Sequence, residues 1–179
     1  MDLVEKILNR GVEEVIERDH LEQALRSPRK LRVKLGIDTT APDLHLGHTV
    51  VLRKLRQFQD AGHTAVLIIG DFTATIGDPS GRSEERKPLS EKEIKKNIKN
   101  YLNQAGRVID IKKTEICYNS KWHEKKGFKN LLGVAGGISE QQVREREDFQ
   151  KREKEGNAIS VLELLYPLPC HSASLQWGE

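Results

Sequence analysis

Apolar positions in the first part of the chain alternate between helical and strand-like spacing. Residues 2–26 carry apolar side chains at helical spacing, with Gly11 as the expected break between two short helices. The stretch at 31–37 alternates apolar and polar residues, which predicts a strand, whereas 47–61 returns to helical spacing. The expected buried face of that helix consists of Val51, Leu55 and Phe58. Residues 64–70 form a continuous apolar run, typical of a strand buried on both faces, so the order strand, helix, strand predicts a βαβ unit.

Capping pairs signal the later helices. A serine followed three positions later by an acidic or amide residue begins each expected helix: Ser90 with Glu93, Ser139 with Gln142, and Ser160 with Glu163. The first of these helices ends at Gly106, and the stretches at 107–111 and 114–119 are two short strand candidates. Residues 70–89 show no period, and a loop of that length within a compact domain is usually functional.

The composition excludes several classes of protein. The 179 residues are 36% apolar and 32% charged, with a formal net charge of +3. No apolar run reaches the roughly 18 residues of a membrane span, and the N-terminus lacks the apolar core of a signal peptide. Cys117 and Cys170 show neither metal-binding spacing nor a disulfide framework, so a cytoplasmic location is expected. The mild positive charge permits a phosphate-bearing partner without requiring one.

Two histidines flank a glycine just after the first expected strand, in the segment DTTAPDLHLGH at 38–48. In open parallel sheets, ligands bind beyond the carboxyl ends of the strands, where helix N-termini present N–H groups. His45 and His48 share one helix face, and Gly47 lets a ligand approach the backbone. Imidazoles can donate hydrogen bonds to phosphate oxygens. The segment therefore predicts a nucleotide site, although a surface loop with two histidines is the simpler interpretation. Neither a P-loop nor a GxGxxG motif is present.

The sequence HLGH at 45–48 resembles the HIGH motif of the class I aminoacyl-tRNA synthetases. The flanking stretches KLGIDTTAPDLHLGHTVVLRKLRQFQDAGH at 34–63 and LIIGDFTATIGDPSGRSEER at 67–86 are similar to bacterial tyrosyl-tRNA synthetases, a similarity that extends over residues 12–168. The resemblance implies a Rossmann-like α/β fold with a parallel sheet and flanking helices, of which the N-terminal part is present. It also implies a tyrosine–tRNA ligase that uses ATP to form tyrosyl-adenylate and then transfers the tyrosyl group to tRNA(Tyr).

The same resemblance assigns a role to individual residues. Those implied in catalysis are Thr40, His45, His48, Arg82 and Arg86. Those implied in ATP binding are Gly36, Asp38, Thr40, His45, Gly47 and His48. Those implied in tyrosine binding are Lys34, Asp71, Thr73, Asp78 and Tyr166. Mg²⁺ is expected to accompany ATP, and no metal site of the protein's own is expected. Some family members have a tyrosine at the position of Lys34, where it helps to bind the substrate phenol, and other bacterial branches have lysine.

The match to the family stops near the end of the chain. After the position of Tyr166 the family continues with a glutamine that serves the substrate amino group and an aspartate that binds the phenol hydroxyl. Cys170 and Ala173 occupy these two positions here, and neither side chain can replace the original group. We therefore expect the chain to be truncated after Leu168, as a frameshift would produce, and to lack the KMSKS loop and the anticodon-binding and tRNA-binding modules.

The expected organisation is an N-terminal helical segment at 1–30, a catalytic portion at 31–168 and an atypical tail at 169–179. The connecting segment at about 100–160 is expected to form a homodimer interface. The implied partners are tyrosine, ATP and tRNA(Tyr), with no membrane. Two alternatives remain at this stage. One is a catalytically inactive fragment that retains partial ATP binding or dimerisation, and the other is a different nucleotidyltransferase with an HxGH motif.

Overall fold

The computed structural model divides the chain into two compact units. It describes residues 2–76, 89–122, 133, 135–137, 139–145, 147–156, 159 and 164. Unit 1 consists of Met1–Ile37, Ala41–Ile68 and Lys99–Cys117, and unit 2 consists of Asp38–Thr40, Ile69–Ile98 and Tyr118–Glu179. Within the described residues, no helix is long and apolar enough to cross a membrane. The capping pair predicted at Ser160 and Glu163 lies outside them.

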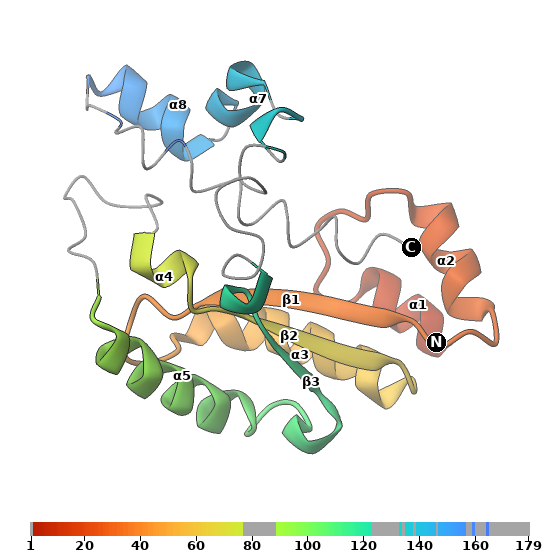
Figure 1. Cartoon of the computed structure of the whole chain (residues 1–179). Coiled ribbons are helices and arrows are strands. Elements are labelled where there is room, and N and C mark those ends of the chain that lie inside the picture. The colour runs from red at the N-terminus through yellow and green to blue at the C-terminus, as the bar shows by residue number, and fades with distance from the viewer. Residues whose placement is uncertain are drawn as a thin grey trace. The chain divides into compact units, whose positions relative to one another are not determined.

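A three-stranded sheet contains β1 (Arg32–Asp38), β2 (Thr64–Gly70) and β3 (Glu115–Tyr118), in the order β1-β2-β3. Helix α3 (Leu46–Asp60) joins β1 to β2, and helix α5 (Glu91–Ala105) lies in the connection from β2 to β3 (Figure 1). Helical crossovers of this kind make neighbouring strands parallel. The central strand β2 is buried almost throughout. The predicted βαβ unit and the Rossmann-like parallel sheet are therefore confirmed.

The two N-terminal helices confirm the predicted break at Gly11. Helix α1 (Leu3–Asn9) ends before this glycine, and helix α2 (Arg18–Arg26) begins after the following loop. Gly11 has a φ of 67°, a left-handed conformation that glycine adopts without a steric penalty. The apolar faces of α1, α2 and α3 meet in one buried cluster, which consists of Ile7, Leu8, Leu25 and Phe58.

Lys54 ties α3 to the end of α1. Its ammonium donates to the carbonyl oxygens of Ile7 (2.8 Å) and Arg10 (2.7 Å) and to the side chain of Gln57 (2.9 Å). The last carbonyls of a helix have no partner within the helix, so a lysine in this position acts as a cap. Partial burial lowers the pKa of Lys54 below its ordinary value.

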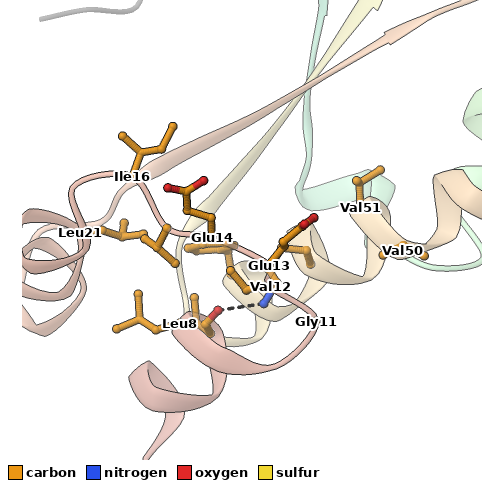
Figure 2. Close-up of a pocket in the computed structure, with 13 residues that line it drawn as sticks. Leu8, Gly11, Val12, Glu13, Glu14, Ile16, Leu21, Val50 and Val51 are labelled. Atoms are coloured by element: carbon orange, nitrogen blue, oxygen red, sulfur yellow. Dashed lines mark hydrogen bonds between the residues drawn. The ribbon is translucent and has the colours of Figure 1, made fainter. Parts of the chain in front are cut away.

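The buried face of α3 differs from the prediction at one position, whereas Leu55 and Phe58 are buried as predicted. Its buried residues are Leu52, Leu55 and Phe58. Val51, expected in the core, is 43% exposed, and that part of the prediction is wrong. Val51 and its neighbour Val50 instead line an apolar groove opposite the loop at 11–16 (Figure 2). Val51 precedes Leu55 by four residues and Leu52 precedes it by three, and both spacings fit 3.6 residues per turn, so helical periodicity does not choose between them.

The strand predicted at 107–111 is also wrong. The N–H of Ile109 donates to the carbonyl oxygen of Ala105 (2.9 Å), so this stretch continues the end of α5 as turns. Asp110 then caps the short 3₁₀-helix η1 (Ile111–Lys113). The apolar β-branched residues of this stretch suit a strand, but the unpaired carbonyls at the helix end bind its N–H groups first. The second predicted strand, at 114–119, is confirmed as β3.

Unit 2 confirms two of the predicted helix starts. The N–H and the hydroxyl of Ser90 both donate to a carboxylate oxygen of Glu93, at 2.9 and 2.6 Å. The hydroxyl of Ser139 accepts from the N–H of Gln142 (3.2 Å), and the Gln142 side chain accepts from the N–H of Ser139 (2.9 Å). The short helices of this unit are α4 (Thr73–Ile76), α7 (Glu140–Arg144) and α8 (Glu147–Lys154). Helix α4 begins within the stretch that shows no sequence period.

Candidate active site

In unit 1, the two motif histidines form a reciprocal cap at the start of α3. Nδ1 of His45 accepts a hydrogen bond from the N–H of Gly47 (3.1 Å), and Nδ1 of His48 accepts one from the N–H of His45 (3.2 Å). The two ring centroids lie 3.9 Å apart. A Cβ at position 47 would lie 3.0 Å from two atoms of the His45 ring, so any other residue here would press on the ring where it lies over the first turn of the helix.

The cap fixes where the imidazole protons sit. Because both Nδ1 atoms accept hydrogen bonds, the neutral rings carry their protons on Nε2. His45 is exposed and His48 is half-buried. The start of α3 therefore combines two Nε2–H donors with the partial positive charge of a helix N-terminus, an arrangement that suits an anion such as a phosphate group.

The surroundings of His48 favour the neutral form of its ring. Partial burial lowers the pKa of His48 below its ordinary value, and the charge of a protonated His45 would lower it further. Protonation at Nδ1 would also remove the acceptor that holds the N–H of His45. The neutral ring is therefore the form that supports the cap.

Acidification should weaken the fold through this residue. The pKa of His48 in the unfolded chain has its ordinary value of about 6.5, whereas the folded value is lower. Above that pH both states are neutral, and below it the unfolded state binds the proton more readily, so stability is lost as the pH falls. We expect the loss to be a fraction of the roughly 1 kcal/mol that a helix cap contributes.

The variant His48→Gln provides the measurement. Glutamine keeps an acceptor at the third helical position and does not titrate. Urea unfolding at pH 7.5 and at pH 5.5 should show a smaller acid-induced loss in the variant than in the original chain. His63, whose pKa is also lowered by burial, contributes equally to both proteins and cancels. An equal loss in the two proteins would contradict a titrating cap.

Two amides of α5 hold the loop that leads into the motif. The side chain of Gln104 accepts from the N–H of Leu44 (2.8 Å) and donates to the carboxylate of Asp43 (2.6 Å). The side chain of Asn100, one helical turn earlier, donates to the carbonyl oxygen of Pro42 (3.2 Å). Both amides lie on one face of the helix, so α5 fixes the backbone immediately before His45.

In unit 2, a second group of polar side chains lies at the carboxyl ends of the strands. We call Asp38, Thr73 and Asn119 the strand-end cluster. The hydroxyl of Thr73 donates to the carboxylate of Asp38 (2.5 Å), and the amide of Asn119 donates to the hydroxyl of Thr73 (3.1 Å). Thr73 and Asn119 are 0% and 5% exposed. Hydrogen bonds between buried side chains restrict their geometry, so Asn119 and Thr73 hold the half-buried Asp38 in place.

The remaining predicted site residues divide into described and undescribed ones. Lys34 and Gly36 are exposed on β1, and Thr40 is half-buried just beyond the strand. Next to it, Thr39 is fully buried, and its hydroxyl has no hydrogen-bond partner among the described residues. The carboxylate of Asp71 accepts hydrogen bonds from the N–H (2.9 Å) and the hydroxyl (2.6 Å) of Ser120. The predictions that lie outside the described residues are Asp78, Arg82, Arg86 and Tyr166.

Sequence reasoning missed four residues that hold the two clusters in place: Asn100, Gln104, Asn119 and Ser120. The available signal was weak. An amide on the apolar face of a helix or directly after a strand suggests a buried hydrogen bond, but its partner is distant in sequence. Among the residues that the structure describes, no three histidine, cysteine or acidic side chains are placed to bind a metal ion.

Comparison with known proteins agrees with the motif and the fold. Residues 26–168 match the family of tRNA synthetases class I (W and Y). The chain is 51% identical to the tyrosine–tRNA ligase of Thermotoga maritima over 163 residues, which are 91% of this chain and 41% of that protein. It is also 51% identical to the tyrosine–tRNA ligase of Salinibacter ruber over 166 residues, which are 90% of this chain and 40% of that protein.

A solved structure supports the same assignment. A C-terminally truncated mitochondrial tyrosyl-tRNA synthetase of Coccidioides posadasii superposes with a TM-score of 0.78 at 25% identity, covering 98% of this chain and 51% of that chain. From the coverages given above, this chain spans less than half the length of the two bacterial ligases. The family match, the histidine motif and the parallel sheet agree. The chain belongs to the class I tRNA synthetases of the tryptophan and tyrosine (W and Y) family.

Proposed function

We propose that the chain is the amino-acid-activating part of a tyrosine–tRNA ligase. In this reaction a carboxylate oxygen of tyrosine attacks the α-phosphorus of ATP, which enters with Mg²⁺, and pyrophosphate leaves to give tyrosyl-adenylate. The tyrosyl group then passes to the terminal ribose of tRNA(Tyr). Charge grows on phosphate oxygens during the first step, so positioned hydrogen-bond donors are the main contribution that a protein can make.

The reciprocal histidine cap is the observation that carries this proposal. Backbone N–H groups occupy both Nδ1 atoms, so His45 and His48 can each offer an Nε2–H to the ATP phosphates without a change of tautomer. Gly47 allows this geometry. Thr40 would assist His45, and Gly36 and Asp38 would frame the nucleotide. Donors that are held in place before the reaction need no reorganisation as charge develops.

The strand-end cluster bears on both sides of the proposal, because Asp38 is assigned to the nucleotide and Thr73 to tyrosine. A carboxylate such as Asp38 is a suitable acceptor for an ammonium group or a ribose hydroxyl, and its bond to Thr73 fixes its direction. The further residues that we assign to the tyrosine pocket are Lys34, Asp71, Thr73, Asp78 and Tyr166. Arg82 and Arg86 would bind pyrophosphate, because a guanidinium group matches two phosphate oxygens at once.

Assembly and location belong to the same proposal. We assign a homodimer interface to the segment at about 100–160 and a cytoplasmic location to the protein. The two bacterial relatives are tyrosine–tRNA ligases of which this chain spans about two fifths. That share supports a second candidate function, in which the chain binds ATP or dimerises without turnover.

Tyrosine-dependent exchange between ATP and labelled pyrophosphate tests the proposal. The 179-residue chain should catalyse exchange with tyrosine, and not with tryptophan. Removing one positioned donor from a developing phosphate charge costs about 100-fold in rate, so we expect losses of that size for His45→Ala and for His48→Ala. The control is His20→Ala, since His20 is exposed on α2, where its Nδ1 lies 3.7 Å from the carboxylate of Glu17.

A thermal-shift titration separates the two candidate functions. ATP and tyrosine should each raise the unfolding temperature if the sites exist, whether or not turnover occurs. Binding without exchange would select the second candidate. Exchange driven by tryptophan would reject tyrosine as the substrate, and the absence of both binding and exchange would reject both candidates.

A further inference from the structure

Asp71 links the ends of two neighbouring strands. It follows β2 directly, and Ser120 lies two residues beyond β3. One carboxylate oxygen of Asp71 accepts from the N–H groups of Ser120 (2.9 Å) and Phe72 (3.1 Å), and the other accepts from the hydroxyl of Ser120 (2.6 Å). Donors from the protein thus bind both oxygens of this carboxylate. We call this arrangement of Asp71 and Ser120 the clamp. It differs from a carboxylate directed toward a ligand, because both oxygens already accept hydrogen bonds within the protein.

The clamp determines the position of Asn119, which immediately precedes Ser120. The N–H of Asn119 donates to the carbonyl oxygen of Ile69 (3.1 Å), and its side-chain oxygen accepts from the N–H of Phe72 (2.8 Å). The side-chain amide is then placed to donate to the hydroxyl of Thr73. The backbone of Asn119 is thus bonded to β2 and its side chain to the residues that follow β2. Because Ser120 is the next residue, a shift of Ser120 would move the Asn119 amide.

The hydrogen bonds in the strand-end cluster have one direction. An ionised carboxylate can only accept, so Thr73 must give its single hydroxyl proton to Asp38. The Thr73 oxygen is then an acceptor, which only a donor such as the amide of Asn119 can satisfy. The direction runs from Asn119 to Thr73 to Asp38, and it requires that Asn119 present its NH₂ group and not its oxygen.

We propose that Asp71 and Ser120 are a positioning pair for amino-acid binding. They hold Asn119 so that its amide orients the hydroxyl of Thr73, which in turn fixes the carboxylate of Asp38. Asp71 acts through Asn119 and does not contact the substrate ammonium. The substrate side of this inference rests on the proposed function, whereas the effect on Asp38 does not depend on any ligand.

The first experiment measures Asp38 without ligand. Carboxyl ¹³C NMR of the full 179-residue chain follows the titration of Asp38 in the original protein and in Ser120→Ala. Loss of the clamp should raise the pKa of Asp38, because a hydrogen bond from Thr73 favours its charged form. Ser120→Thr keeps the hydroxyl and should restore the original titration. An Asp38 titration that Ser120→Ala leaves unchanged would overturn the proposal.

The second experiment measures tyrosine affinity. We expect Asp71→Asn and Ser120→Ala each to raise the Kd for tyrosine about tenfold, and the double variant to show about the same loss, because the two residues form one unit. A loss in Asp71→Asn alone, or additive losses in the double variant, would show that Asp71 contacts the substrate directly. Asp110→Asn is the matched control, since Asp110 also accepts a backbone N–H but belongs to unit 1.

The two experiments test different parts of the inference. If tyrosine binds to no version of the chain, the proposed function fails, and the NMR titration still decides whether the clamp positions Asp38. A melting curve for each variant shows that it is folded under the conditions of the titration. Ser120→Ala leaves the backbone hydrogen bond of residue 120 to Asp71 in place, so we expect this variant to remain folded.

Discussion

Gly70→Ala is expected to destabilise unit 2 and to separate Thr73 from Asp38. A Cβ on residue 70 would lie 1.7 Å from a carboxylate oxygen of Asp38 and 2.4 Å from the hydroxyl oxygen of Thr73. Both distances are well inside van der Waals contact, so the side chains of Asp38 and Thr73 would have to move and we expect their hydrogen bond to be disrupted. Overpacking of a buried site usually costs about 1–3 kcal/mol, and we expect the upper end because a buried polar pair is disrupted as well.

Gly36→Ala is the matched control for this substitution. Gly36 lies in the neighbouring strand β1, and a Cβ there would meet no atom within 4 Å. Alanine in a strand loses less conformational entropy on folding than glycine, so we expect a change of less than about 0.5 kcal/mol. Urea unfolding followed by circular dichroism compares the two variants. Similar losses in both would contradict a specific close approach at Gly70.

The close approach at Gly70 was visible in the sequence only as a glycine at the end of an apolar strand. Such a glycine suggests that another group comes near the backbone, but it does not identify that group. Asp38 and Gly70 end adjacent strands, so the partner becomes known once the strand order is known. The spacing of residues along the chain carries no such information.

Local signals predicted most of the fold. The apolar run of β2, the histidine motif at the start of α3 and the capping pairs at Ser90 and Ser139 each depend on a few consecutive residues. The error at 107–111 has a different origin. β-branched residues favour a strand there, but carbonyls at the end of α5 and the cap at Asp110 take the backbone hydrogen bonds.

The candidate site was predicted in part for the same reason. His45 and His48 belong to a short contiguous motif, so their position at a helix start followed from the sequence. Asn119 and Gln104 are ordinary amides whose partners are distant in sequence, and only the fold brings them together. Generic residues that support a site are therefore harder to predict from sequence than the residues of the motif itself.

Leu52→Ala should destabilise unit 1 by about 3 kcal/mol, since replacing a buried leucine by alanine typically costs 2–5 kcal/mol. Leu52 is 0% exposed on the buried face of α3, next to the turn that carries His48. The substitution removes three heavy atoms from a closely packed position and leaves a cavity that neighbouring residues fill only in part. Urea unfolding midpoints give the change in the free energy of unfolding.

Val51→Ala is the control that shows which of the two neighbouring residues of α3 is buried. Val51 is 43% exposed and faces the apolar groove, so its truncation should cost less than about 0.5 kcal/mol, as for other exposed positions. If the sequence prediction of this face were correct, Val51 would be buried and the order of the two losses would be reversed. A larger loss for Val51→Ala than for Leu52→Ala would overturn this packing of α3.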